Sequence, residues 1–485
     1  MATDQPGEDP TSPGTPDDWL VPRAPGPVRA LVRLPGSKSM TNRALILAAL
    51  ADRPTLISGP LVARDTQLMA DALRALGCRI EELPGAWRVE PAPLGGPAPL
   101  GGPAPSSRQP GPGQPGSGRH SVGIDVGNAG TVLRFVPPVA ALTGADVTFR
   151  GDARASQRPV GPLLAALREL GAAISDDGTG AVPFVVHGRG SVAGGTVTID
   201  ASSSSQLVSG LLLAAPRFGA GAEIRHCGAA LPSAPHIEMT VRMLRACGAN
   251  VQAVDDDAAG AGPGPASLAG TGDGGPVKKI WRVLPGSISP GLIDIEPDLS
   301  NAVPFLAAAL ATGGEVTVAD WPADSLQPAV RIIELLQAMG ADVHRTPDGL
   351  RVRGPGRIDG IGADLSEVGE LTPVLTALAA LANSPSEFTG IGHLRRHESD
   401  RLAALAGEIG KLGGHVTETP DGLRIRPSAL HAGGVSFDSH DDHRLVMAAA
   451  VLGLVTDGLR VHNAATVGKT FPEFSRFWAR ILAPA

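Results

Sequence analysis

The stretch Leu76-Gly77-Cys78-Arg79-Ile80 decides the fold, because variants of it recur four more times along the chain. In each copy an apolar-periodic helix ends at a small residue and a short alternating strand follows. The other copies are Leu170-Gly171-Ala172-Ala173-Ile174, Cys247-Gly248-Ala249-Asn250-Val251, Met339-Gly340-Ala341-Asp342-Val343 and Leu412-Gly413-Gly414-His415-Val416. One glycine after a helix is an ordinary helix end, but five copies separated by alternately long and short intervals indicate an internal repeat.

This repeated unit predicts the fold class. Helices that alternate with short strands cover the face of a sheet, so the chain is expected to be an α/β protein with two similar halves. The boundary between the halves is predicted near Ile293 to Asp298, and Val28 to Leu34 is predicted as the first strand. The portion from Val455 onward is expected to complete a sixth unit in altered order.

Three segments have compositions that cannot bury a core. Residues 1–22 are rich in Pro, Gly and acidic residues and are predicted to form a disordered tail. The stretches 91–118 and 255–276 consist mostly of small and turn-forming residues. Both are interpreted as surface insertions, the first of them within a hairpin.

Composition limits the class of function. The chain has 485 residues, of which 42% are hydrophobic, so it is long enough for two or more domains. A formal charge of -7, 3% aromatic residues and no Tyr argue against a nucleic-acid-coating surface. The first twenty residues lack the features of a signal peptide, and no apolar run reaches membrane-spanning length. Three cysteines without zinc or disulfide spacing fit a reducing compartment, so a cytoplasmic protein is expected.

A first candidate site is Pro35-Gly36-Ser37-Lys38-Ser39-Met40-Thr41-Asn42-Arg43, which runs into the apolar segment 44–50. Two cations lie within about one turn of a helix start, where backbone N-H groups lack partners, so the stretch can hold an anion. The alternative is a capped surface helix with solvated cations. A nucleotide-binding P-loop is disfavoured, because only Ser37 separates Gly36 from Lys38.

Other helix starts in the first half have the same design. They are Asn128-Ala129-Gly130-Thr131 with Arg134, the loop 152–159 with Arg154 and Arg158, the run Ser202-Ser203-Ser204-Ser205-Gln206, and Ser233-Ala234-Pro235-His236. Each alone is compatible with ordinary helix capping or with solvated arginines. A flexible serine linker is the less favoured interpretation of the serine run, because the run enters a helix too apolar for a surface.

The second half repeats the design with mixed charges. The stretches are 296–301, 367–370, 395–401, 439–444 and Lys469-Thr470-Phe471-Pro472. Charge runs usually mark a solvated face. Here cations stand beside carboxylates and imidazoles at helix starts, as a proton-transfer site for an anionic substrate requires.

Taken together, these stretches resemble the 5-enolpyruvylshikimate-3-phosphate (EPSP) synthase family. The motifs, spread over residues 35–472, are PGSKSMTNRAL, GNAGT with Arg134, QRP, SSSSQ, SAPH, DLSN, HESDR, DDHR and KTFP. The tail and the two insertions lie outside the resemblance.

The resemblance implies two domains, each of three β-α-β-α-β-β units, with the active site in the cleft between them. It places residues 37–295 in the first domain and residues 23–36 plus 296–485 in the second. It also implies an addition-elimination reaction that transfers the enolpyruvyl group of phosphoenolpyruvate to the 5-hydroxyl of shikimate 3-phosphate, in chorismate and aromatic amino acid biosynthesis. No metal or organic cofactor, no nucleic acid and no membrane are implied, and a monomer is expected.

The resemblance also assigns substrate contacts by motif match. For shikimate 3-phosphate it implies Lys38, Ser39, Arg43, Ser204, Ser205, Gln206, Ser233 and Glu370. For phosphoenolpyruvate it implies Lys38, Gly130, Arg158, Gln206, Arg401, Arg444 and Lys469. His397 belongs to the binding set as well.

For catalysis the resemblance implies Glu370 as the base for the 5-hydroxyl and Glu398 as the carboxyl that protonates C3, assisted by Lys38 and His397. Three positions depart from the commonest pattern, because Glu370 replaces Asp, His397 replaces Lys and His393 replaces Asn. An unperturbed His titrates far below a Lys. A histidine at this position keeps the charge of the lysine only if anions beside it favour its protonated form. We expect His397 to be kept protonated in this way by Glu398 and substrate phosphate.

Two alternatives remain. The sister enzyme that uses UDP-N-acetylglucosamine shares the fold and the donor, but it normally carries a reactive cysteine in a loop. Cys78 and Cys247 follow helices here, and Cys227 lies in an apolar strand context. A non-catalytic anion-binding protein would need the cations without Glu370 and Glu398.

Overall fold

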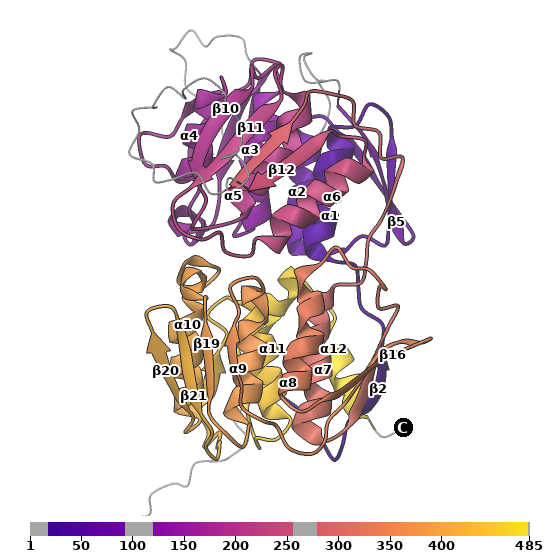
Figure 1. The fold of residues 1–485 in the computed structure, drawn as a ribbon, viewed down its shortest axis with the longest axis vertical. Helices are drawn as coiled ribbons and strands as arrows, with labels where there is room; N and C mark the ends of the chain where they lie inside the picture. The colour runs from indigo at the N-terminus through magenta and orange to yellow at the C-terminus, as the bar shows by residue number, and fades with distance from the viewer. Residues whose placement is uncertain (1–17, 93–119, 256–278, 484–485) are drawn as a thin grey trace, which may run out of the picture.

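The structure, a computed structural model, describes residues 18–92, 120–255 and 279–483. Figure 1 shows two bodies stacked along the long axis, the upper one built mainly from the first half of the chain and the lower one from the second. Each body has its own hydrophobic core, one formed largely by residues 40–288 and the other by residues 21–32 and 299–482. The chain therefore folds around two separate cores.

The upper body contains six helices and twelve strands among the described residues. The helices are α1 (Lys38–Ala49), α2 (Arg64–Ala75), α3 (Gly130–Ala141), α4 (Gly161–Glu169), α5 (Gln206–Ala214) and α6 (Pro235–Ala246), with short 3-10 turns η1 (Ala155–Gln157) and η2 (Ala215–Arg217). The strands are β3 (Thr55–Ser58), β4 (Arg79–Leu83), β5 (Ala86–Glu90), β6 (Ser121–Asp125), β7 (Asp146–Arg150), β8 (Ala173–Ser175), β9 (Phe184–His187), β10 (Gly195–Asp200), β11 (Ala222–Cys227), β12 (Val251–Asp255), β13 (Lys279–Val283) and β14 (Leu292–Asp294).

The lower body is built in the same way. Its helices are α7 (Leu299–Thr312), α8 (Ile332–Ala338), α9 (Thr372–Ala380), α10 (Arg401–Lys411), α11 (His443–Gly453) and α12 (Phe474–Leu482), with 3-10 turns η4 (Pro328–Arg331), η5 (Gly369–Leu371), η6 (Gly392–Arg396) and η7 (Ala464–Lys469). Its strands are β1 (Trp19–Leu20), β2 (Arg29–Val32), β15 (Glu315–Ala319), β16 (Asp342–Thr346), β17 (Gly349–Arg353), β18 (Gly362–Asp364), β19 (Ser386–Thr389), β20 (His415–Thr419), β21 (Gly422–Arg426), β22 (Ser436–Asp438) and β23 (Arg460–His462).

The repeat appears as a recurring small sheet. In β6-α3-β7-α4-β8-β9, strands β6 and β7 are parallel, and β9 joins β7 and β8 by antiparallel pairing. The orders β14-β3-β5-β4, β10-β11-β13-β12, β16-β17-β15-β2 and β18-β19-β21-β20 follow the same plan. The α/β fold with three units in each half is thus confirmed. The five glycines of the repeat lie just after helices, with φ from 86° to 102°, a region that only glycine adopts without strain.

The sixth sheet is completed from both ends of the chain. Strand β23 pairs in parallel with β22 and antiparallel with β1. Trp19 and Leu20 are therefore part of a sheet, and the prediction that a disordered tail extends to residue 22 is wrong for them. Trp19 packs against Phe474 at 6.1 Å between ring centroids, and Val21 is buried in the core. The averaged composition of the tail concealed these apolar residues; residues 1–17 lie outside the described residues.

The two Pro/Gly-rich segments differ in position. The first follows β5 and precedes β6, which belong to different sheets, so the prediction of a hairpin insertion is wrong there. The second joins β12 to β13, which pair as an antiparallel hairpin. Turn-forming composition cannot distinguish a hairpin from a link between two units. Residues 93–119 and 256–278 lie outside the described residues.

The chain passes between the bodies at two adjacent segments. Strand β2 pairs with β15 of the lower body, whereas β14 pairs with β3 of the upper body. Gly36 forms an isolated bridge with Pro297, and Ser37 N donates to the carbonyl of Glu296 at 2.8 Å. We propose that the described residues between 37 and 295 form the first domain, and that residues 18–36 and 296–483 form the second. The predicted start of the second domain at residue 23 moves to residue 18, because β1 pairs with β23.

The central helices point their N-termini at the other domain. α1, α3 and α5 contact one another in the first domain, as do α7, α9 and α11 in the second. Their residues are almost all buried, as expected for helices that are apolar on every side. Gly210 allows α5 to approach α3, because a Cβ at this position would collide with the carbonyl of Arg134. Among the described residues, no helix is long and apolar enough to cross a bilayer.

Candidate active site

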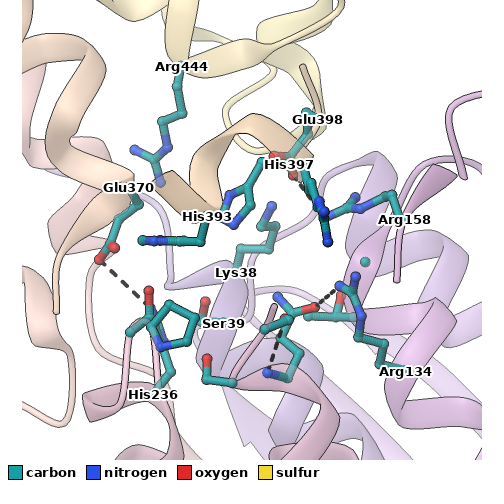
Figure 2. A pocket seen from close by; sticks show the side chains of 18 of the residues that line it. Lys38, Ser39, Arg134, Arg158, His236, Glu370, His393, His397, Glu398 and Arg444 are labelled. Atoms are coloured by element: carbon teal, nitrogen blue, oxygen red, sulfur yellow. Dashed lines mark hydrogen bonds and ion pairs between the residues drawn. The ribbon is translucent and has the colours of Figure 1, made fainter. Parts of the chain in front are cut away.

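A cavity lies between the domains, and its wall is made by helix starts (Figure 2). Helices α1, α3, α5 and α6 of the first domain and α7, α10 and α11 of the second each contribute a residue of their first turn. The N-terminus of a helix carries a partial positive charge and free N-H groups. Their convergence therefore favours anionic ligands.

Every predicted site residue except Lys469 lines this cavity. The first domain contributes Lys38, Ser39, Arg43, Gly130, Arg158, Ser204, Ser205, Gln206 and Ser233, and the second contributes Glu370, His397, Glu398, Arg401 and Arg444. Lys469 ends η7, is buried, and donates its ammonium to the backbone carbonyl of Asp441. The motif gives the position of this lysine in the chain but not the direction of its side chain.

Asp298 connects the starts of two helices from different domains. One carboxylate oxygen caps α7 by accepting from Asn301 N at 3.0 Å, and the other accepts from Lys38 N at 3.0 Å. The Lys38 ammonium lies 3.2 Å from a carboxylate oxygen of Asp65. The candidate stretch 35–43 is therefore fixed at the junction of the domains, with the ammonium of Lys38 inside the cavity.

Arg43 is a buried link between helices. It donates to Thr240 Oγ1 at 2.7 Å and to the carbonyls of Ser39 and His236 at 2.9 and 3.1 Å, and its guanidinium lies 5.2 Å from the ring centre of Phe135. Burial lowers the pKa of Arg43 to about 9. Much of the hydrogen-bonding capacity of Arg43 is thus used to hold α1 against α6.

Arg158 reaches from the first domain to the second. It donates to the carbonyl of Asn128 at 2.6 Å, and its other terminal nitrogen lies 3.7 Å from Glu398 Oε1. A Cβ at position 130 would lie 2.5 Å from Arg158 Nη2 and 2.9 Å from Arg134 Nη1. The glycine of the GNAGT motif therefore makes room for two guanidinium groups.

Arg401 organises the second domain's side of the cavity. Its Nε lies 2.7 Å from Asp442 Oδ2, and its Nη2 lies 2.9 Å from Glu398 Oε2. Asp442 is fully buried and caps α11 through Arg444 N at 2.9 Å. Burial would lower the pKa of Arg401, but Asp442 and Glu398 outweigh it and raise that pKa. Arg401 is thus a permanent cation fixed between two carboxylates.

Glu398 is held as a carboxylate by arginines of both domains. Burial would raise its pKa, yet Arg158 and Arg401 lower the pKa of Glu398 well below its ordinary value. This fits the ion-pair distances on its two oxygens. With only the protein's own groups around it, Glu398 carries no proton to donate.

Three histidines around the cavity are neutral near pH 7. Burial lowers the pKa of His393 to about 4, and it lowers the pKa values of His397 and His443 well below 6.5, each with help from neighbouring cations. The rings of His393 and His397 meet edge to face at 5.4 Å. We expected Glu398 and substrate phosphate to keep His397 protonated; among the protein's own groups, burial and Arg401 outweigh Glu398, so that part of the expectation is wrong.

Glu370 approaches the cavity from η5, with its Oε1 3.7 Å from His236 Nε2 of the first domain (Figure 2). Burial would raise the pKa of Glu370, but His236 and, more weakly, Arg444 lower it. Glu370 is therefore ionised, as Glu398 is, and an ionised carboxylate can accept a proton.

Sequence reasoning assigned no substrate or catalytic role to several lining residues. Those inside or beside the quoted motifs are Thr131, Arg134, Ser203, Pro232, His236, Ser300, His393, Arg396 and His443. Their position in helix-start motifs was the available signal. Asp65 stands in the ordinary acidic first turn of α2, and no pattern distinguishes it from a solvated carboxylate.

The described lining of the cavity contains no reactive cysteine. None of Cys78, Cys227 and Cys247 lines the cavity, and burial raises the pKa of Cys78 and Cys247 to about 11, so both are unreactive thiols at neutral pH. Among the described residues, no group of three or more His, Cys, Asp or Glu side chains has the geometry to hold a metal ion.

Comparison with known proteins gives consistent matches. A family model described as EPSP synthase (3-phosphoshikimate 1-carboxyvinyltransferase) matches residues 22–96, 109–271 and 273–478. A 3-phosphoshikimate 1-carboxyvinyltransferase of Kocuria rhizophila is 47% identical over 468 residues, which cover 96% of this chain and 97% of that protein.

Two solved structures are similar over nearly the whole chain. An EPSP synthase from Acinetobacter baumannii has a TM-score of 0.71 and 25% identity, with 96% of this chain and 98% of that chain covered. The enolpyruvyl transferase NikO from Streptomyces tendae has a TM-score of 0.67, 16% identity and the same coverage. The second likeness concerns the fold alone.

Proposed function

The chain belongs to the EPSP synthase family, and from this premise we propose that it transfers the enolpyruvyl group of phosphoenolpyruvate to the 5-hydroxyl of shikimate 3-phosphate. The products are 5-enolpyruvylshikimate 3-phosphate and phosphate. The protein is thus a transferase of the shikimate pathway, which leads to chorismate and the aromatic amino acids.

The charge pattern of the cavity is the observation that carries this function. Among the described residues, seven cationic side chains line the cavity: Lys38, Arg43, Arg134, Arg158, Arg396, Arg401 and Arg444. Of the described acidic residues, Asp65, Glu370 and Glu398 alone oppose them there. The two substrates bring two phosphates and a carboxylate, and fixed cations can replace the water that these anions lose on binding.

The binding roles follow the two domains. We assign shikimate 3-phosphate mainly to the first domain, through Lys38, Ser39, Arg43, Ser204, Ser205, Gln206 and Ser233, with Glu370 from the second. We assign phosphoenolpyruvate to Lys38, Gly130, Arg158, Gln206, Arg401 and Arg444, which come from both domains. Lys469 joins this set only if its ammonium leaves the carbonyl of Asp441.

The two cavity glutamates divide the proton transfers. Glu370 takes the 5-hydroxyl proton as the hydroxyl oxygen attacks C2 of phosphoenolpyruvate, and Glu398 gives a proton to C3. The tetrahedral intermediate then loses the C3 proton and phosphate. The ionised state of Glu370 supports its assignment as base. Lys38 stabilises the anions of both substrates, and a neutral His397 offers them a hydrogen bond rather than a fixed charge.

The sister reaction with UDP-N-acetylglucosamine is disfavoured, because no cysteine lines the cavity. A cytoplasmic monomer is our proposal for location and assembly. It rests on the family's small-molecule substrates and on three free cysteines, which suit a reducing compartment.

A coupled phosphate-release assay tests the function. We expect release when phosphoenolpyruvate and shikimate 3-phosphate are both present, and none when either is omitted or when UDP-N-acetylglucosamine replaces the shikimate. Glu370→Gln should lower kcat by about 10² to 10⁴ while the protein stays folded. Parent protein that releases no phosphate from the pair would remove the proposal, and release with the UDP-sugar alone would favour the sister reaction.

A further inference from the structure

His236 faces the catalytic base of the opposite domain. It stands in the first turn of α6 in the first domain, and its Nε2 lies 3.7 Å from Oε1 of Glu370 in the second. Figure 2 shows the two side chains directed at each other across the cavity. Their side chains are only 18% and 15% exposed, so water screens the contact weakly.

The backbone around His236 is tied to the segment that carries Glu370. His236 N donates to the carbonyl of Ser233 at 3.0 Å, and Ser233 N donates across the domain boundary to the carbonyl of Ser366 at 2.8 Å. The carbonyl of His236 accepts from Arg43 Nη2 at 3.1 Å and Thr240 Oγ1 at 3.0 Å. These bonds fix the imidazole relative to Glu370 only when the domains meet.

The other groups facing Glu370 are already engaged or uncharged. Arg444 donates to the carbonyl of Ser300 at 2.9 Å, and Arg401 is bound to Asp442 and Glu398. His393, from η6, is neutral because burial lowers its pKa to about 4. When its imidazole is protonated, His236 is therefore the group best placed to offset the burial of the Glu370 carboxylate.

The distance between His236 and Glu370 lets the imidazole lower the pKa of the carboxyl while the carboxylate oxygen stays free to accept a hydrogen bond. At 3.7 Å the imidazole nitrogen is within ion-pair range but beyond a good hydrogen bond. Among the described residues, Oε1 of Glu370 accepts no hydrogen bond, although it is buried. The oxygen thus stays available to a substrate hydroxyl.

We propose that His236 is a positioning residue that keeps the Glu370 carboxylate ionised and directed at the substrate hydroxyl. This rests on the proposed function, because it takes Glu370 as the base. The domain that does not carry the base would then help to control the protonation of the base in the assembled cleft.

The test compares the pH dependence of kcat/KM for His236→Gln, His236→Lys and the parent. An opposite charge at this range shifts a carboxyl pKa by about one unit or more. The acid limb of His236→Gln should therefore move up by about one pH unit, because burial of Glu370 is no longer offset. His236→Lys should keep the limb near its parental position or move it lower.

The control is His344→Gln. His344 lies on β16, outside the cavity, and its Nε2 lies 2.7 Å from Asp342. The substitution His344→Gln removes an imidazole that faces a carboxylate on the exposed surface, so the acid limb of kcat/KM should not move.

A second measurement does not depend on turnover. An infrared titration of the carboxyl band, assigned by its loss in Glu370→Gln, reports the protonation of Glu370 directly. We expect this titration to move to higher pH in His236→Gln. An unchanged titration, or a raised KM for shikimate 3-phosphate with an unmoved acid limb, would overturn the inference and leave His236 as a substrate contact. Parent protein without phosphate release would instead count against the proposed function, while the infrared result would still judge the contact.

Discussion

Glu398 is in the wrong protonation state for its proposed task until substrate arrives. Arg158 and Arg401 hold its pKa well below the ordinary value, yet protonation of C3 requires an acid. The same two arginines are assigned to phosphoenolpyruvate. Anions of the substrate would offset their charge, so the remaining burial would raise the pKa of Glu398. Glu398 would then become protonated when phosphoenolpyruvate binds, and could donate this proton to C3 of the same molecule.

Proton uptake on substrate binding tests this sequence. We expect binding of phosphoenolpyruvate and shikimate 3-phosphate to take up protons, measured by calorimetry in two buffers with different ionisation enthalpies. Glu398→Gln should take up fewer protons, by as much as about one per site, because its amide cannot titrate. Equal proton uptake by parent and variant would contradict the protonation of Glu398 on substrate binding.

At the scale of single residues, the sequence predicted which residues line the cavity better than it predicted their protonation states and hydrogen bonds. Helix-start motifs predicted the residues at the cavity wall, because caps and cations beside small residues are local features. The neutral His397 and the engaged Lys469 could not be predicted, because burial and the direction of a side chain depend on contacts between distant segments. Asp65 lacked even a local signal.

At the scale of elements, Asp298 is the shared cap of α7 and α1. Asp298→Ala should lower the free energy of unfolding by about 1 to 2 kcal/mol, because both helix starts lose an acceptor. It should also raise the KM of both substrates, since Lys38 begins at that junction. Asp298→Asn has a single acceptor oxygen and should recover only part of the loss.

Asp400→Ala is the matched control, because Asp400 caps α10 by accepting from Ala403 N at 3.1 Å. Urea unfolding should show a smaller destabilisation than in Asp298→Ala, because only one helix start loses its acceptor, and both KM values should change less. If the two variants changed KM equally, the shared cap would have no special part in placing Lys38.

The elements themselves were predictable where the pattern is local. The repeated helix ends gave five units, and their glycines adopt the positive φ that a helix end of this type needs. The partners of β1, β2 and β14 were not predictable from such patterns, because each strand joins a sheet whose other members lie far away in the sequence. The resemblance to a family, and not the periodicity of the sequence, predicted that the chain passes from one domain to the other and back.

For the whole molecule, buried neutral histidines make stability depend on pH. His393, His397 and His443 have folded-state pKa values below 6.5, so the unfolded chain binds their protons first as the pH falls. The stabilisation is fully present above about pH 6.5 and is lost progressively below it, by up to about 1.4 kcal/mol per pH unit for each histidine.

Denaturant midpoints at about pH 7.5, 6 and 5 measure this loss, in a range above the titration of most carboxylates. We expect the midpoint to fall steadily below pH 6.5, and His443→Gln should flatten the slope by removing one of the three groups. A constant midpoint across this range would show that the folded protein binds these protons as readily as the unfolded chain.

The net charge of -7 works against the binding of two anionic substrates, so the cations at the cavity must attract them locally. Arg396 is the exposed one of these; among the described residues no hydrogen bond or ion pair engages its side chain. Arg396→Gln should therefore lower kcat/KM several-fold at low ionic strength with little change in kcat, and the deficit should shrink as salt screens the charge. Arg351→Gln, which changes an exposed arginine of β17 outside the cavity, should leave kcat/KM at the parental value. A deficit in Arg396→Gln that persists unchanged at high salt would identify a direct contact in the bound complex instead of long-range attraction.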